Sequence, residues 1–384
     1  MRLSLHGGFG EKGRTSLGVD TGGYRLLLDA GVKTSARGTP DYWPAITRDE
    51  LARTDAIVVT HAHEDHVGAL GWCLAQGFRG RILMTGDAHA ECASVVAAYD
   101  GHDAAQRVRA ARVETLPVGE RAATLGPLTL ATGRSGHIAG GVWCAVDDGA
   151  RRITYCGDVV PDSPVFAMDP LPACDALVLD ASYGDDATPA PERAAEILAW
   201  VRARPQGSIL PTPRFGRSLE LFALLRSDAV LATGMREALV AQLDASRWLA
   251  EGAAEGLRRD LSRASSCEAR EPLPRSPVLC DDGMGMSGPS AEFLRIAERT
   301  AHPVLLTGHV PEGSPGDRML AAGQAGWIRL PTHPTLDENV SLAARSGARI
   351  VLGHSCERDA LLRLADRLPR LSPNVATGDR MEIG

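Results

Sequence analysis

Four residues that can bind a metal ion stand within six positions of this chain. They belong to the stretch Thr60–Gly68, which we call the ligand loop and which reads Thr-His-Ala-His-Glu-Asp-His-Val-Gly. Side chains alternate with a period of two in an extended segment, so His61 and His63 are expected to point the same way. Asp65 and His66 fall at the start of a predicted helix and turn toward a second position. Imidazole and carboxylate together suit zinc, with manganese or iron as alternatives, and one short loop can serve two adjacent ions.

The segments on either side of the ligand loop must position it. The apolar run Ala56-Ile57-Val58-Val59 predicts a buried strand that enters the loop, and a helix is predicted from Asp65 to Gln76. The alternative is a polar surface loop that is rich in histidine by chance. Such a loop would need neither the strand before it nor the turn at Gly68, so a metal site is the favoured interpretation.

Composition limits the classes of protein that this chain can represent. Its 384 residues suffice for two or three domains, and 44% hydrophobic with 23% charged residues is typical of a globular protein. The formal net charge of −7 provides no overall basic field for nucleic acid. Aromatic residues make up only 4% of the chain, which argues against an extensive base-stacking surface.

Cysteine usage and the first residues indicate the compartment. Eight cysteines are scattered without a C-x-x-C pair, which favours a reduced cytoplasmic setting over a disulfide framework. Met1–Gly8 lacks the apolar run of a signal peptide, and no apolar stretch reaches membrane-spanning length. We therefore expect a cytoplasmic protein without membrane association, and the oligomeric state stays open.

The secondary-structure pattern changes twice along the chain. Strands dominate to about Gly184, and apolar strands then alternate with helices to about residue 325, as in a small parallel α/β domain. We predict a first domain from residues 1–184 and 326–384, with residues 185–325 inserted into it. A long helix from Met235 to about Arg263 and a strand at Trp327–Leu330 are among the predicted elements.

Further motifs resemble those of the metallo-β-lactamase superfamily. A strand that ends in Asp29 precedes the ligand loop, and Gly136-His137 and then Gly157-Asp158 follow it in the order of the superfamily motifs. The resemblance implies an αββα sandwich with a dinuclear metal site at one edge.

Three later stretches resemble motifs A, B and C of the β-CASP subgroup of nucleases. They are Leu177–Gly184 with Asp180, then Thr332-His333, and then Gly353-His354. The implied fold class is therefore α/β, a metallo-β-lactamase αββα sandwich with an inserted α/β β-CASP domain. Motif B departs from the usual pattern, because Pro334 and Thr335 follow its histidine.

The resemblance implies two divalent metal ions, zinc in the first place and manganese as the alternative. Seven side chains would hold them: His61, His63 and His137 on one ion, Asp65, His66 and His354 on the other, and Asp158 bridging both. A carboxylate can span ions roughly 3.5–4 Å apart, and metal-held water has a pKa of about 7. The resulting hydroxide would attack phosphorus, with Asp65 also orienting it.

The resemblance also assigns residues to proton transfer and to substrate binding. The leaving 3′-oxygen needs a proton, and His333, held by Asp180, is the predicted general acid. Arg217 and Ser287 are the predicted substrate contacts. Taken alone, Asp180 could cap a helix and His333 could belong to a His-Pro turn, but their order with the other motifs favours catalysis.

The predicted function is that of a metal-dependent nuclease for single-stranded RNA in RNA processing or degradation. Its products would carry a 5′-phosphate and a 3′-hydroxyl. Histidine at motif C, here His354, is typical of RNA-acting members, whereas DNA-acting members usually carry valine. The alternatives are a DNA nuclease of the same subgroup, a small-molecule metallo-hydrolase of the same fold, and a non-catalytic scaffold. A small-molecule hydrolase needs neither the inserted domain nor His333, and scaffold members lose ligands. Endonuclease and 5′-exonuclease modes are both left open.

Overall fold

The computed structural model describes residues 1–119 and 121–384, which form two compact units. The first unit comprises Met1–Asp162, Met168–Ala187 and His333–Gly384, and the second comprises Ser163–Ala167 and Thr188–Thr332. The chain therefore leaves the first unit and returns to it. The domain boundaries predicted from the sequence, 1–184, 185–325 and 326–384, stay predictions, because compactness alone does not show which part folds independently.

One sheet of the first unit contains the strand that enters the ligand loop. Its strands within the described residues are β1 (Arg2–Gly7), β2 (Ser16–Thr21), β3 (Tyr24–Leu28), β4 (Ala56–Val58), β5 (Arg81–Met84), β6 (Val113–Thr115) and β19 (Arg380–Glu382). They lie in the order β19-β1-β2-β3-β4-β5-β6. The pairs from β19 to β3 are antiparallel and those from β3 to β6 are parallel. The fully buried β4 is central in this sheet, as expected for a strand with apolar side chains on both faces.

The second sheet of this unit brings three more motifs to one edge. Its strands are β7 (Ala123–Leu125), β8 (Leu128–Arg134), β9 (Val142–Asp147), β10 (Arg152–Tyr155), β11 (Ala176–Asp180) and β18 (Ile350–His354). In the described part of the chain their order is β18-β11-β10-β9-β8-β7. Because β11 pairs in parallel with both β10 and β18, Asp180 lies opposite His354 and the carboxyl ends of the three strands meet.

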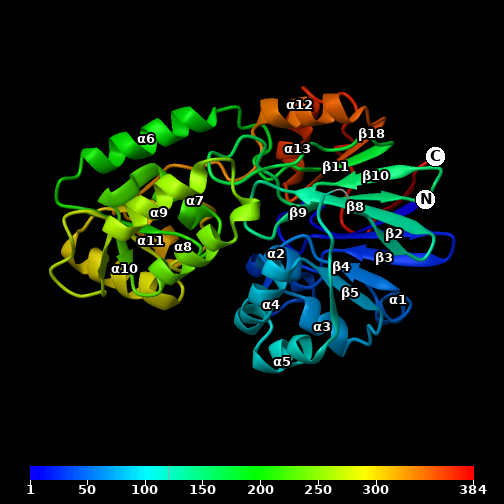
Figure 1. Cartoon of the computed structure of the whole chain (residues 1–384), viewed down its shortest axis with the longest axis horizontal. Coiled ribbons are helices and arrows are strands. Elements are labelled where there is room, and N and C mark those ends of the chain that lie inside the picture. The colour runs from blue at the N-terminus through cyan, green and yellow to red at the C-terminus, as the bar shows by residue number, and fades with distance from the viewer. Residues whose placement is uncertain (120) are drawn as a thin grey trace. The chain divides into compact units, whose positions relative to one another are not determined.

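Helices cover the outer faces of both sheets and give the layer order helix, sheet, sheet, helix (Figure 1). On the first sheet they pack through a core that includes Ile57 and Val96, and on the second through Leu177 and Leu361. The helices of this unit are α1 (Arg48–Ala52), α2 (Glu64–Val67), α3 (Leu70–Ala75), α4 (Gly86–Tyr99), α5 (His102–Ala110), α12 (Leu336–Ser346) and α13 (Arg358–Ala365). The predicted fold class, an α/β αββα sandwich that carries a further α/β unit, is confirmed.

The second unit is built on a third sheet, in which all strand pairs are parallel. Its strands are β12 (Ser208–Pro211), β13 (Val230–Ala232), β14 (Ser265–Cys267), β15 (Pro277–Cys280), β16 (Val304–Leu306) and β17 (Ala325–Trp327), in the order β14-β13-β15-β12-β16-β17. Its helices are α6 (Ala190–Arg202), α7 (Arg217–Leu225), α8 (Met235–Asp244), α9 (Ala253–Arg263), α10 (Gly288–Thr300) and α11 (Pro315–Ala321). Within residues 1–119 and 121–384, every helix is too short or too polar to cross a bilayer.

The helix predicted at Asp65–Gln76 is interrupted in the structure and forms α2 and α3 instead. The reason lies in the backbone carbonyls of residues 64–66, which accept hydrogen bonds of 2.8–3.0 Å from the N–H groups of Thr15, Ala30 and Val32. These bonds tie the ligand loop to the segments that follow β1 and β3.

Two differences from the sequence-based prediction lie in the second unit. The helix predicted from Met235 to Arg263 is split into α8 and α9, because Trp248 between them is buried and its carbonyl accepts a hydrogen bond from Ala167. The strand predicted at Trp327–Leu330 ends at Trp327 and pairs with β16 in the third sheet, not with the C-terminal elements of the first unit.

Gly31 marks the closest approach between the segment after β3 and the ligand loop. A Cβ atom at Gly31 would lie 1.7 Å from the carbonyl oxygen of Asp65. We expect Gly31→Ala to lower the free energy of unfolding by roughly 1–3 kcal/mol or more, because the two backbones must move apart. Urea denaturation measures this. Gly86→Ala is the matched control, because nothing lies within 4 Å of its Cβ position, and it should stay within about 0.5 kcal/mol of the parent. Equal losses in both variants would contradict the close approach.

Candidate metal centre

A buried carboxylate, that of Asp29, anchors both ends of the ligand loop. Its Oδ1 accepts a hydrogen bond from the Thr60 N–H at 2.7 Å, and its Oδ2 accepts from the hydroxyls of Thr60 and Tyr155 at 2.8 and 2.7 Å. The same Oδ2 lies 2.7 Å from Nδ1 of His66, which therefore donates and leaves Nε2 for another role. A carboxylate behind an imidazole in this way fixes the tautomer and orientation of a metal-ligating histidine.

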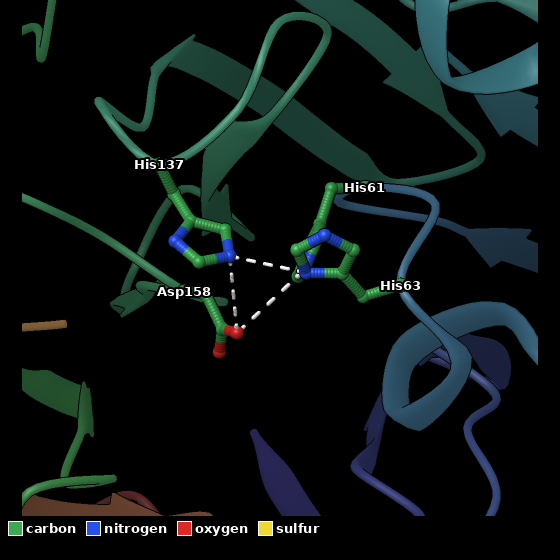
Figure 2. Close-up of side chains that lie close together, drawn as sticks. All are labelled: His61, His63, His137 and Asp158. Carbon is green, nitrogen blue, oxygen red and sulfur yellow. Dashed lines mark hydrogen bonds and ion pairs between the residues drawn. The ribbon is translucent and has the colours of Figure 1, made fainter. Parts of the chain in front are cut away.

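Three histidines converge on one carboxylate oxygen of Asp158, which follows β10. Ligand atoms of His61, His63, His137 and Asp158 all lie within 4.8 Å of one another, and Figure 2 shows the three rings turned toward the carboxylate. Oδ2 of Asp158 is 3.6 Å from Nε2 of His61 and 3.6 Å from Nε2 of His137. Nε2 of His137 is in turn 3.1 Å from Nδ1 of His63. The structure therefore brings together the whole set predicted for the first ion.

The other oxygen of Asp158 faces a second set. Ligand atoms of Asp65, His66 and Asp158 also lie within 4.8 Å of one another. Nε2 of His66 is 3.1 Å from Oδ1 of Asp158 and 3.7 Å from Oδ2 of Asp65. Since its two oxygens point to different ligand sets, Asp158 has the placement expected of a bridging carboxylate. The ligand assignments themselves stay predictions.

The residues present fit divalent cations. Nε2 of His61, Nε2 of His66 and Oδ1 of Asp158 are among the buried atoms that make no hydrogen bond within the described chain. Each buried polar atom without a partner costs about 1–3 kcal/mol, so three of them at one point are expected to serve another ligand. Imidazole nitrogen and carboxylate oxygen are donors that zinc and manganese accept.

Electrostatics at the site also favour added positive charge. Burial lowers the pKa of His61 well below its ordinary value, and the neighbouring imidazoles add to this effect. Burial acts in the same direction on His66, but the carboxylates of Asp158, Asp65 and Asp29 outweigh it and hold that pKa well above the ordinary value. Burial would raise the pKa of Asp158, yet His66 and other imidazoles hold it well below the usual range. Because ligating imidazoles must be neutral, metal uptake would displace the proton of His66.

Asp180 and His333 form a pair beside these ligands. Asp180 is buried at the end of β11, where its Oδ1 accepts from the N–H and hydroxyl of Ser182 at 3.1 and 2.6 Å, and its Oδ2 from the Val159 N–H at 3.1 Å. The same Oδ2 is 2.9 Å from Nδ1 of His333, which is 3.7 Å from Oδ2 of Asp158. His333 therefore donates through Nδ1 to Asp180. The three side chains also form a potential ligand group, although the hydrogen bond already occupies Nδ1.

His354 is not brought into any of these ligand groups. It is fully buried at the end of β18, where Nε2 donates to the Gly157 carbonyl at 3.0 Å and Nδ1 lies 3.1 Å from Oγ of Ser355. Its ring centroid is 6.0 Å from that of His66. In this arrangement His354 holds the peptide that precedes Asp158. To bind a metal through Nε2, as predicted, it would first have to break that hydrogen bond.

The two predicted substrate contacts belong to the second unit. Arg217 begins α7, and its Nη2 donates to Oγ1 of Thr332 at 3.2 Å. Ser287 precedes α10, and its hydroxyl donates to the Asp282 carboxylate at 2.5 Å. Their contact with substrate stays a prediction.

The sequence motifs predict no role for Tyr155 or Thr60, although both donate hydrogen bonds to Asp29. Tyr155 ends a buried strand, and its hydroxyl has to find a partner there because buried polar groups are almost always hydrogen-bonded. That requirement is the signal by which the residue could have been found, but it does not name the partner.

The comparison with protein families agrees with this fold and site. Residues 24–210 match the family described as the Beta-lactamase superfamily domain. That range contains the ligand loop, His137, Asp158 and Asp180. This part of the chain therefore matches a model of the superfamily, and the predicted resemblance to the metallo-β-lactamase superfamily is confirmed.

Two named proteins are similar to this chain in sequence. The chain is 26% identical to the transcription termination factor FttA of Methanothermobacter thermautotrophicus, over 97% of this chain and 65% of that protein. It is 28% identical to ribonuclease TTHA0252 of Thermus thermophilus, over 43% of this chain and 39% of the ribonuclease. The chain thus spans somewhat less than two thirds of the length of the termination factor.

One solved structure resembles this chain over almost its whole length. It is the crystal structure of an Enterococcus faecalis protein of unknown function, which is 11% identical, has a TM-score of 0.60 and covers 99% of each chain. At this identity the likeness concerns the fold alone.

We expect metal binding to depend on the carboxylate of Asp158. We expect Asp158→Asn to lower the affinity for Zn²⁺ or Mn²⁺ by more than about 100-fold, because even the loss of a group behind a ligand costs roughly 10–100-fold. Calorimetric titration after dialysis against chelator, with metal analysis of the purified protein, measures this. The exposed His89 on α4 provides the control His89→Ala, which should bind metal as the parent does. Unchanged stoichiometry and affinity in Asp158→Asn would rule out the proposed centre.

Proposed function

We propose that this protein is a metal-dependent ribonuclease that hydrolyses phosphodiester bonds of single-stranded RNA and leaves a 5′-phosphate and a 3′-hydroxyl. The observation that carries the proposal is the placement of Asp158 between two ligand sets, with the Asp180–His333 pair at its side. Two cation sites can stabilise the attacking and leaving oxygens of an in-line displacement at phosphorus. A separate proton donor can protonate the leaving oxygen. The relatives named as a ribonuclease and as a transcription termination factor support RNA as the substrate.

Each residue of the site has a role in this proposal. His61, His63 and His137 would hold one cation, Asp65 and His66 the other, and Asp158 would contact both; His354 completes the second set only if it turns from Gly157. Cations held there would neutralise charge on the phosphate and acidify water. Asp65 accepts a proton from, and orients, the attacking water. Burial raises the pKa of Asp65, which suits a carboxylate that has to take up a proton.

Proton delivery to the leaving oxygen falls to His333. Asp180 accepts its Nδ1–H and is itself held by Ser182 and Val159, so the ring cannot swing. Nε2 then carries the proton that the 3′-oxygen of the leaving nucleoside receives. The carboxylate behind the ring stabilises the imidazolium form and fixes the tautomer, as in other carboxylate–histidine pairs.

The setting of the reaction is part of the proposal. All eight cysteines are free thiols, and burial raises the pKa of several, including that of Cys92 to about 12. Buried thiols of this kind are poor thiolate nucleophiles and persist without disulfides. We therefore place the ribonuclease in the reducing cytoplasm, with zinc as the expected ion and manganese as the alternative.

The direct test of the function compares two nucleic acids. End-labelled single-stranded RNA and DNA of equal sequence are incubated with the protein and Mn²⁺ or Zn²⁺, with and without chelator. We expect metal-dependent cleavage of RNA at least about 10-fold faster than of DNA, with 5′-phosphate on the products. Cleavage that survives chelation, or a preference for DNA, would overturn the proposal. Asp158→Asn, whose affinity for metal should be far lower, controls for contaminating nucleases.

The proposed acid role of His333 is tested with two substrates that differ in their leaving group. We expect His333→Ala to retain bound metal and to slow RNA cleavage by about 10²–10⁴-fold, the usual contribution of a general acid. Hydrolysis of bis(p-nitrophenyl) phosphate should fall far less, because nitrophenolate leaves without a proton. Single-turnover rates on both substrates measure the difference. An equal loss on both substrates, or loss of metal from the variant, would remove the acid role from His333.

A further inference from the structure

The carboxyl edge of the third sheet contains the features of a binding site. Its six strands within the described chain are parallel, so the loops after β12, β15, β16 and β17 all leave the same edge. β13 follows β12 in the chain and lies on one side of it in the sheet. β17 follows β16 and lies on the opposite side of β12. Adjacent strands whose connections diverge in this way leave a crevice between their carboxyl ends, which is where open parallel sheets bind ligands.

Arg217 occupies this crevice. A Cβ atom at Gly308, in the loop after β16, would lie 1.9 Å from Nη1 of Arg217, so the guanidinium lies directly against the glycine backbone. Its Nη2 donates to Thr332, and its Nε is buried without a hydrogen bond to any described residue. No carboxylate of the described chain forms an ion pair with Arg217. A cation with an unused donor, held at a switch point, fits an anionic ligand such as a phosphate.

Trp327 stands at the same glycine. Its indole N–H donates to the Gly308 carbonyl at 2.8 Å, and the Arg329 guanidinium lies 5.3 Å from its ring centroid. The hydrogen bond fixes the ring, yet 41% of the residue is exposed, more than any other tryptophan, tyrosine or phenylalanine of the described residues. A fixed, solvent-facing indole next to an unpaired guanidinium has the chemistry of a stacking platform for bases.

From these contacts we propose that Trp327 stacks an unpaired nucleobase while Arg217 binds the adjoining phosphate. The carboxyl edge of the third sheet is then a subsite for single-stranded nucleic acid. Both side chains touch Gly308, so one nucleotide can reach both. Bases in a duplex are stacked on each other and cannot lie on the indole, which makes the subsite selective for single strands. The inference rests on the proposed ribonuclease function and adds the part of the substrate that the second unit recognises.

The test measures binding without cleavage. A labelled single-stranded RNA of 12 nucleotides and an oligomer of equal length and charge that lacks bases are titrated with the protein in chelator, by fluorescence anisotropy. We expect Trp327→Ala to weaken RNA binding roughly 5- to 100-fold, the usual effect of losing a stacked base, and to leave binding of the abasic oligomer unchanged. Trp327→Phe should recover most of the affinity. Arg217→Gln should weaken binding of both oligomers and reduce the salt dependence by about one phosphate contact.

Control measurements distinguish loss of base stacking from a disturbed fold and from binding of a second copy of the chain. Val240, which is 42% exposed on α8, provides the matched variant Val240→Ala, expected to bind both oligomers as the parent does. Equal weakening of RNA and abasic oligomer in Trp327→Ala would mean that the indole only holds the loop after β16, and would overturn the proposal. So would unchanged RNA binding, or a change in sedimentation that shows the ring buried between copies of the chain.

If the subsite fails while the parent still cleaves RNA with metal, the ribonuclease proposal stands alone. If the parent neither binds nor cleaves RNA, both fall.

Discussion

The hydrogen bonds of the Asp29 carboxylate are the constraint on which the rest of the site depends. They hold the first residue of the ligand loop through Thr60, the last histidine through His66, and the second sheet through Tyr155. Asp29 accepts them from a left-handed backbone conformation, with φ of 62°, which aspartate tolerates better than most residues. Since the carboxylate is buried, each missing donor would cost about 1–3 kcal/mol, so the two sheets and the loop are held together before any cation binds.

The second sheet then divides the chemistry between two carboxylates. Asp158 follows β10 and faces the imidazoles of the ligand sets, whereas Asp180 ends the neighbouring β11 and faces His333. Because the two strands are parallel neighbours, their carboxyl ends lie side by side, and the proposed cation binding and proton delivery would use the same edge of the sheet. Gly157 makes this possible, since a Cβ atom at its φ of 53° would lie 2.9 Å from Oγ1 of Thr60.

Much of this arrangement could be predicted from sequence, because its parts are local. The order of ligands in the ligand loop, the buried strand before it and the positions of Asp158 and Asp180 after apolar strands are visible in short windows. The interruption between α2 and α3 depends on hydrogen bonds from Thr15, Ala30 and Val32, which are distant in sequence. The same holds for His354: its place at the end of an apolar strand predicts the edge at which it lies, but the hydrogen bond from its Nε2 to the Gly157 carbonyl depends on the tertiary structure. The partner of a buried polar group is set by the tertiary structure, so the periodicity of apolar residues in the sequence does not predict it.

The route of the chain between the units has a mechanical consequence. The polypeptide returns from the second unit at the bond between Thr332 and His333, so the proposed proton donor is the first residue after the crossing. Another crossing follows Asp162, four positions beyond Asp158. Loosening of the second unit would therefore act first on His333, which is bound to Asp180, while the histidines of the ligand loop belong to segments that never leave the first unit. On gradual heating the proposed ribonuclease would consequently become inactive while any bound ions are still in place, and cooling at that stage would restore turnover without any need to supply metal again.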